Sequence, residues 1–145
     1  MEAEELLHRY AAGERKFSSA KLSGVDLKGV DLSGIDLQSA DLTGADLSEA
    51  TLTKANLYSA NLSKASLTDT KLSQAKIDSA NLSQTDLSGA DLSQASLSYS
   101  NLSNAYLEKA NLSGANLVST NLNRAFFEQA NLSRTNLTQA DLTGS

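Results

Sequence analysis

A leucine recurs at every fifth position from Leu22 to Leu142, and only Ile77 and Phe127 replace it. Two residues before it stands a small or β-branched residue, most often Ala, and the residue between them is usually Asp or Asn. A period of five fits neither the 3.6-residue repeat of a helix nor the two-residue alternation of a long strand. The pattern instead indicates short extended segments separated by corners.

Within each five-residue unit, the alternation decides which side chains point inward. Residues two apart in an extended segment share a face, so the Ala and the Leu point one way and the Asp or Asn between them points the other. The last two positions are rich in Ser, Thr, Gly and Gln and turn the corner. Each pentapeptide is therefore predicted to form one side of a polygonal coil with an apolar interior.

The residue after each Leu indicates how many sides a coil has. It is a hydroxyl residue in alternate units, as at Ser23, Ser33 and Thr43, with Asn123 as an exception, whereas the intervening units are mixed. Such an alternation persists from coil to coil only if the number of sides is even, and four is the smallest even number that encloses a core. Duplication of an ancestral ten-residue unit would leave the same alternation. The alternation alone therefore does not decide between a four-sided coil and such a duplication.

One coil buries too little apolar surface to fold alone, so the coils must stack as in other solenoids. The repeat accounts for about six coils of 20 residues at roughly 4.8 Å spacing between coils. The inward positions of the stack are predicted to form its core, and they include Leu27, Leu47, Ile77, Leu107 and Phe127.

The first residues predict a different element. Residues 2–12 indicate a short helix, with acidic residues at its start and Gly13 able to end it. Leu6, Leu7 and Tyr10 share one face of this helix, and we expect that face to cover the first coil.

Phe17 falls on the five-residue lattice, but Arg15 is unsuited to be its inward partner, so we interpret Phe17 as a plug beneath the helix. The predicted domains are a cap helix and plug over residues 1–19 and a β-helix over residues 20–145. At the other end, Phe127 is predicted to fill space in the last coil.

The composition excludes or disfavours several classes of function. The chain has no Cys, which excludes disulfides, thiolate metal ligands and thiol catalysis. No apolar run approaches the roughly 18 residues of a membrane helix, and the acidic opening "MEAEELLHRY" is unlike a secretory signal, so we expect a cytoplasmic protein. The formal net charge of −5 disfavours binding to nucleic acid backbones or to anionic lipids.

The unit Ala-(Asp/Asn)-Leu-x-x, repeated over residues 20–143, resembles the pentapeptide repeat family. The opening "ELLHRYAAGERKFSSAKLSG" is similar to the N-terminal cap of cyanobacterial members. The resemblance implies an all-β fold: a right-handed quadrilateral parallel β-helix with a short α-helical cap. It implies little about function, because one fold hosts several roles. Some members inhibit DNA gyrase by imitating duplex DNA, and others take part in cyanobacterial cell differentiation.

With coils of 20 residues, the acidic excess falls on one face. The face that contains Leu27, Leu47, Leu107 and Phe127 carries seven acids against two bases, whereas the other three faces are close to neutral. Tyr106 lies outward on the same face, one coil from Phe126. We call this surface the acidic face, and its candidate interaction residues are Asp26, Asp46, Glu49, Asp69, Asp86, Tyr106, Glu108, Phe126 and Glu128.

Two interpretations of the acidic face remain open: a surface that binds a basic protein partner, or charge that only keeps the solenoid soluble. On another face, Asn61, Asn81, Asn101 and Asn121 form a column whose amides are expected to hydrogen-bond to one another.

Catalysis is not expected. His8 is the only histidine and lies in the predicted helix, so neither a catalytic triad nor a histidine metal site is predicted, and no cofactor is implied. The sequence therefore predicts a non-catalytic scaffold or protein-interaction module. The alternative is a DNA-mimic inhibitor of DNA gyrase or topoisomerase. An end-to-end homodimer through the C-terminal coil also remains open.

Overall fold

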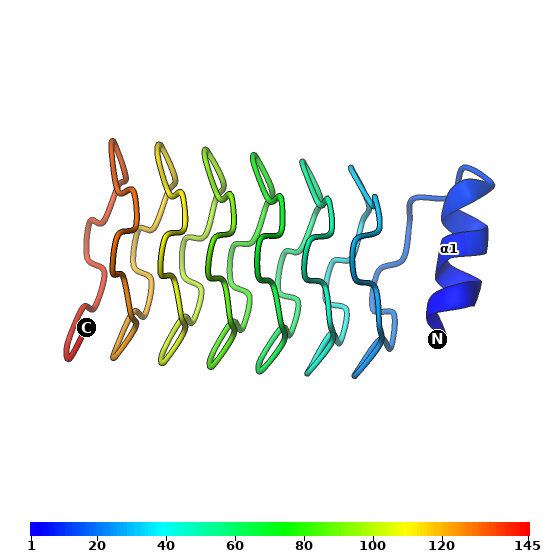
Figure 1. The fold of residues 1–145 in the computed structure, drawn as a ribbon, viewed down its shortest axis with the longest axis horizontal. Coiled ribbons are helices and arrows are strands. Elements are labelled where there is room, and N and C mark those ends of the chain that lie inside the picture. The colour runs from blue at the N-terminus through cyan, green and yellow to red at the C-terminus, as the bar shows by residue number, and fades with distance from the viewer.

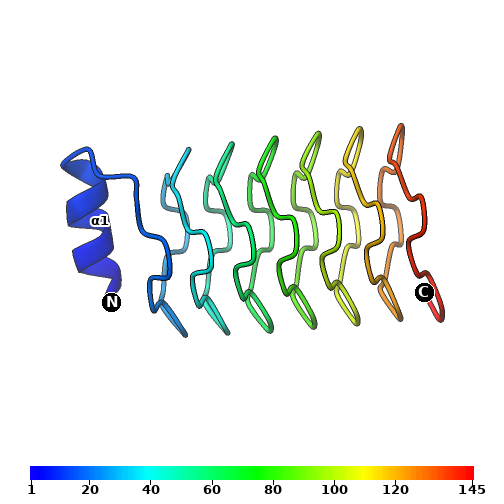
Figure 2. The same cartoon turned by 180° about the vertical axis from the view of Figure 1, so that it is seen from behind.

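The computed structural model describes all 145 residues. It contains one helix, α1 (Ala3–Ala11), followed by a tower of stacked coils that continues to the C-terminus at the far end (Figure 1). Seen from behind, α1 again lies at one end of the tower and the C-terminus at the other (Figure 2).

The coils are held in register by parallel bridges between residues 20 apart, from Lys16↔Asp36 to Asn121↔Asp141. A coil therefore consists of four pentapeptides, in agreement with the sequence. Each bridge involves a single residue on each side, and no continuous strand forms. The extended segments are this short because a corner follows every bridge residue within three positions.

Each corner is a β-turn closed by the residue in the Leu position, whose carbonyl oxygen accepts the N–H three residues later, as in the 3.0 Å bond from Ala45 to Leu42. The third residue of the turn has a positive φ at every fifth position from Ser19 to Gly144, which is the pattern of a type II turn. Glycine is used at only some corners, and Lys54 has φ of 61°. Such a conformation costs a residue with a Cβ about 1–2 kcal/mol.

Hydrogen bonds between coils hold the corners in this conformation. The N–H of Lys54, for example, donates to the carbonyl of Ser73 in the next coil at 3.0 Å. On each side, the residue in the Leu position also donates to the next coil, as Leu52 does to Lys71 at 2.7 Å. The tower thus satisfies its backbone polar groups between coils, where a sheet would use long strands.

The interior is one cluster of 40 buried apolar residues. Phe17, Leu27, Leu47, Ile77 and Leu107 all lie in it with at most 3% of their surface exposed, in agreement with the sequence.

Four polar residues are buried with the apolar core: Thr70, Thr85, Ser100 and Thr120. The Thr70 hydroxyl donates to the carbonyl of Leu47, which closes a corner of the preceding coil, at 2.8 Å. Thr85 and Thr120 repeat this contact at 2.9 and 3.0 Å. A buried hydroxyl therefore joins two coils without leaving an unpaired polar atom.

Helix α1 lies within the predicted range of residues 2–12 and covers the first coil. Leu6 is fully buried in the core cluster, and Leu7 and Tyr10 pack against it. Gly13, with φ of 100°, follows the helix and turns the chain toward the tower.

Polar groups of the N-terminal segment bond the edge of the first coil. The ammonium group of Met1 donates to the carbonyl of Lys21 at 2.6 Å, and the Tyr10 hydroxyl donates to the carbonyl of Ser33 at 2.8 Å. Inside the tower, the equivalent carbonyls of Asp41 and Thr53 accept N–H groups from the preceding coil. The N-terminal segment therefore supplies two of the donors that a further coil would supply.

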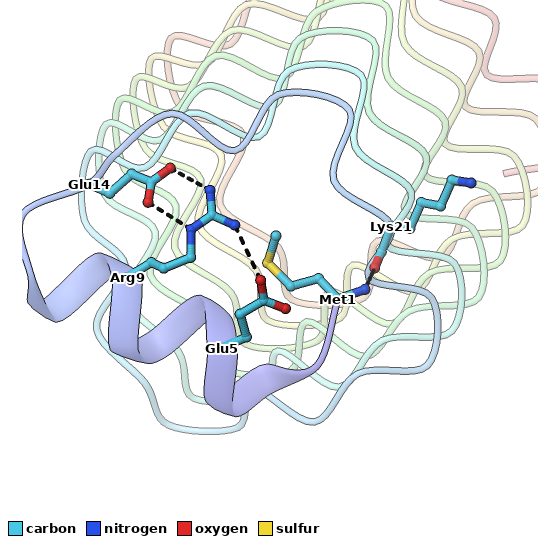
Figure 3. Close-up of polar contacts among 5 residues, drawn as sticks. All are labelled: Met1, Glu5, Arg9, Glu14 and Lys21. Carbon is cyan, nitrogen blue, oxygen red and sulfur yellow. Dashed lines mark hydrogen bonds and ion pairs between the residues drawn. The ribbon is translucent and has the colours of Figure 1, made fainter.

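An ion pair holds α1 to the segment that follows it. The Arg9 guanidinium makes two hydrogen bonds to the Glu14 carboxylate, at 2.7 and 2.5 Å, and lies 3.6 Å from Glu5 (Figure 3). It also lies 5.0 Å from the centre of the Phe17 ring. Phe17 lies in the Leu position of the first side, since the ladder already begins at Lys16.

Candidate interaction face

The acidic face is organised by one outward column. Parallel bridges join its members in the order Asp26, Asp46, Ser66, Asp86, Tyr106 and Phe126. The column therefore runs from carboxylates near α1 to aromatic rings near the C-terminal end, with one residue per coil.

The carboxylates of this column are fixed by the corner that follows each of them. Oδ1 of Asp26 accepts the N–H of Lys28 at 3.1 Å, and Oδ1 of Asp86 accepts the N–H of Ser88 at 3.0 Å. These are Asx turns, which explain why Asp or Asn is favoured at the outward position of the repeat. All such bonds on this face use Oδ1, so the second carboxylate oxygen remains available to solvent or to a partner.

Asp46 is held most firmly. Its Oδ1 accepts both the Ser48 hydroxyl at 2.5 Å and the Ser48 N–H at 3.0 Å. The hydroxyl, and after it the N–H, lower the pKa of Asp46 below its ordinary value. Asp46 is therefore ionised at neutral pH.

The other acids of the face lie at the corners. Glu49 forms an exposed ion pair with Lys28 at 3.4 Å, which leaves Lys109 as the second base of the face. The Asp69 carboxylate lies over Gly89 in the next coil, in the space that a Cβ there would occupy. Among the seven acids only Glu49 forms an ion pair, so most of the negative charge on this face is not neutralised.

Tyr106 and Phe126 form the apolar part of the face. Their rings are stacked with 5.1 Å between centroids and 7° between planes, and the two residues are 45% and 48% exposed. The adjacent residue Phe127 points inward and is partly buried against the core. Of these two adjacent residues, Phe126 therefore lies on the surface and Phe127 packs toward the interior.

The column of Asn61, Asn81, Asn101 and Asn121 differs from the expectation. No hydrogen bond joins these amides to one another. Each amide oxygen instead accepts the N–H two residues later, as Asn61 does from Ser63 at 3.1 Å. The prediction of an amide ladder was wrong, because the amide oxygens of this column accept only the N–H groups of their own corners.

Two exposed aromatic residues were not singled out from the sequence. Tyr99 is 69% exposed at a corner, and Tyr58 is 46% exposed beside another corner. Neither belongs to the acidic face. An aromatic residue at a corner position otherwise occupied by Gly or by a polar or charged residue is the sequence signal that would have found Tyr99.

The structure has one surface depression, of about 380 Å³, which lies on α1 and includes no residue of the acidic face. Its lining consists of Glu2, Glu4, Glu5, His8 and Arg9. Arg9 is already bound to Glu14, and none of the lining residues is hydrophobic. No helix of the chain meets the length and hydropathy needed to cross a membrane.

The five-residue register, the inward Leu positions and the 20-residue coil together match a known repeat. The family model for pentapeptide repeats matches eight copies, over residues 16–34, 35–74, 75–114 and 110–145. The chain belongs to the pentapeptide repeat family. Its members are in general structural or interaction modules without enzymatic activity, and their fold is a right-handed β-helix solenoid.

Solved structures similar to this pentapeptide repeat protein include cyanobacterial ones. The alr5209 protein from Nostoc PCC 7120 is 33% identical, with 93% of this chain and 94% of that chain covered and a TM-score of 0.52. Rfr23 from Cyanothece 51142 is 30% identical, with 95% and 93% covered and a TM-score of 0.32.

QnrB1, a plasmid-mediated fluoroquinolone resistance protein, is 21% identical, with 86% of this chain and 63% of that chain covered and a TM-score of 0.56. At that identity the likeness concerns the fold alone. No curated protein matches this pentapeptide repeat protein.

Proposed function

We propose that this pentapeptide repeat protein is a non-catalytic, cytoplasmic scaffold that binds a basic protein partner through the acidic face. The observation that carries the proposal is the exposed Tyr106–Phe126 stack at the end of a column of solvent-facing carboxylates. Aromatic residues are enriched at protein interfaces, and a surface of one sign steers a partner of the opposite sign.

The geometry of the face favours a protein ligand over a small molecule. The column carboxylates stand on a side wall of the tower that has no pocket, so a small ligand there would remain largely in water. Their Asx turns hold them in place before a partner arrives, so binding would order few side chains. Asp26, Asp46 and Asp86 would meet Lys or Arg side chains, while the two rings would supply the apolar contact.

Affinity capture with a charge-reversed protein tests this role. Asp46→Lys combined with Asp86→Lys should lose a partner that the wild-type protein captures from an extract. The matched control is Asp31→Lys combined with Asp91→Lys. Asp31 and Asp91 lie on a different face and have Asx-turn bonds equivalent to those of Asp46 and Asp86. Replacing both by Lys changes the net charge by the same amount as the test variant.

If the two double variants capture the same proteins, the acidic face is not the binding surface.

A supercoiling assay with purified DNA gyrase and stoichiometric protein tests the inhibitor role separately. We expect no inhibition, because the acidic excess lies on one face whereas duplex DNA is charged all round. Clear inhibition would overturn the scaffold proposal in favour of the DNA-mimic role.

A further inference from the structure

The cap of the tower contains an arginine that is held jointly by a carboxylate and an aromatic ring. The Arg9 guanidinium donates two hydrogen bonds to Glu14, at 2.7 and 2.5 Å, and lies 5.0 Å from the centre of the Phe17 ring. Arg15 lies 3.7 Å from the centre of the Tyr10 ring. Both cations that the chain places over its own rings are therefore arginines, whose planar and weakly hydrated group suits this contact.

The acidic face presents the same two kinds of group side by side. A parallel bridge joins Asp86 to Tyr106 in the next coil, and another joins Tyr106 to Phe126. Asp86 and Phe126 thus lie on opposite sides of Tyr106 along the tower. Because Phe126 stacks on one face of the Tyr106 ring, the other face of that ring is turned toward Asp86.

The lengths of the side chains leave space over this face of the ring. The Asp86 carboxylate is attached directly to Cβ, whereas the Tyr106 ring reaches further from the wall of the tower. Ser66, the next member of the column beyond Asp86, is shorter still. The outer part of the ring therefore extends past the carboxylate, and Tyr106 is 45% exposed. A flat cation can lie on this part of the ring with its edge against the carboxylate.

The carboxylate is positioned for such a cation. Oδ1 of Asp86 accepts the N–H of Ser88 at 3.0 Å, which fixes the side chain, while Oδ2 accepts no hydrogen bond within the chain. Asp86 forms no ion pair, and no Lys or Arg of the chain lies over the Tyr106 ring. Both groups are therefore free to contact a cation that another molecule supplies.

We propose that Asp86 and Tyr106 form a site for an arginine side chain of the partner. The guanidinium stacks on the face of the Tyr106 ring that is turned toward Asp86 and donates a hydrogen bond to Oδ2 of Asp86. This inference rests on the proposed function and identifies the basic residue that the acidic face recognises. A guanidinium can stack and donate from its edge at once, whereas the ammonium of a lysine is compact and strongly hydrated. The site thus distinguishes the shape of a cation as well as its charge.

Fluorescence anisotropy with labelled hexa-arginine and hexa-lysine tests the site, because the two peptides carry the same charge. The protein should bind hexa-arginine about fivefold more tightly than hexa-lysine at physiological salt. Tyr106→Leu keeps an apolar side chain but removes the ring, so it should remove most of this preference. Asp86→Asn removes the charge and keeps an oxygen for the Asx turn, as at Asn61. It should weaken hexa-arginine binding more than hexa-lysine binding.

Two matched controls lie outside the acidic face. Tyr99→Leu removes an exposed ring whose counterparts in the adjacent coils, Ser79 and Ser119, carry no charge. Asp91→Asn removes a carboxylate that has an equivalent Asx-turn bond. Both controls should retain the arginine preference of the wild-type protein. Circular dichroism checks that each variant is folded.

NMR spectra of the wild-type protein locate the bound peptide without any substitution. Addition of hexa-arginine should shift the ring signals of Tyr106 and leave those of Tyr99 in place. Equal affinities for the two peptides, a preference that Tyr106→Leu leaves intact, or unshifted Tyr106 signals would overturn the arginine site. The acidic face could still bind a basic partner in each of those cases. If neither peptide binds the wild-type protein, the proposed function fails together with the arginine site.

Discussion

The ring of Phe126 lies almost parallel to that of Tyr106 in the preceding coil, 7° from coplanar and 5.1 Å away between centroids. Both residues occupy the outward position, where the repeat most often places Asp or Asn. An exposed pair of this kind contributes about 0.5–1.5 kcal/mol beyond the area that it buries. The stack therefore stabilises the C-terminal end modestly, and in the proposed function it offers an apolar contact on a charged surface.

Phe126→Asn should lower the free energy of unfolding by about 1 kcal/mol or less, because the ring is already half exposed. In the captured complex, by contrast, the same substitution should weaken partner binding strongly. Urea unfolding and quantitative capture measure the two effects. A double-mutant cycle with Tyr106→Asn isolates the ring contact, and an interaction energy of zero would mean that the stack contributes nothing.

Thr70→Val should destabilise the tower by about 1 kcal/mol, since it removes a buried hydroxyl donor while keeping the shape of the side chain. The carbonyl of Leu47 would lose its 2.8 Å bond from Thr70 and keep only the turn bond from Ala50. Thr53→Val is the control, because the Thr53 hydroxyl makes no hydrogen bond within the chain. Equal losses in the two variants, measured by chemical denaturation, would contradict the role of the buried bond.

Tyr10→Phe should loosen the helix cap. The carbonyl of Ser33 would lose the donor that replaces a preceding coil, at a cost of about 1 kcal/mol. Hydrogen exchange should accelerate in α1 and the first coil and remain unchanged in the later coils, because solenoid stability is mainly a nearest-neighbour property. Tyr58→Phe, which removes a hydroxyl without a partner, should leave exchange unaltered throughout.

Acid should destabilise the tower through its Asx turns. Hydroxyl groups lower the pKa of Asp31, Asp41, Asp46 and Asp141, in each case from the Ser or Thr two residues later. Because these pKa values are below those of the unfolded chain, about 3.9, the unfolded chain binds protons first as the pH falls. Their contribution to stability is therefore complete above about pH 4 and is lost as the pH falls through the folded pKa values.

Ser48→Ala isolates one of these contacts. Without the Ser48 hydroxyl, the pKa of Asp46 should rise toward the ordinary value, because its largest stabilising contact is gone. A carbon-detected NMR titration of the carboxyl groups measures this change. The pKa of Asp141, which depends on Thr143, serves as an internal reference and should not move.

Much of the fold could be predicted because its determinants are local and repeated. The five-residue spacing assigns Leu27, Leu47 and Leu107 to the interior, and the 20-residue register places Tyr106 beside Phe126. The aromatic stack and the acidic column follow from that register alone. Helix α1 was predicted within one residue at each end, since its acidic start, apolar face and final glycine are all sequence signals.

The tertiary structure decided the contacts in which several groups compete for one partner. The amide oxygens of Asn61 and Asn81 accept N–H groups of their own corners, and the two amides do not bond each other. Lys54 adopts a positive φ because bonds to the next coil hold it there.

The ends of the tower depended on tertiary structure in the same way. Only the stacked coils show that Met1 and Tyr10 replace a missing layer at one end, while Leu132 and Leu142 are left uncovered at the other. The sequence by itself determined the five-residue period, the inward side chains and the face that carries the acids, because these depend on spacing along the chain. The partners of individual polar groups and the difference between the two ends depend on which groups meet when 20-residue coils stack, and no local pattern contains that information.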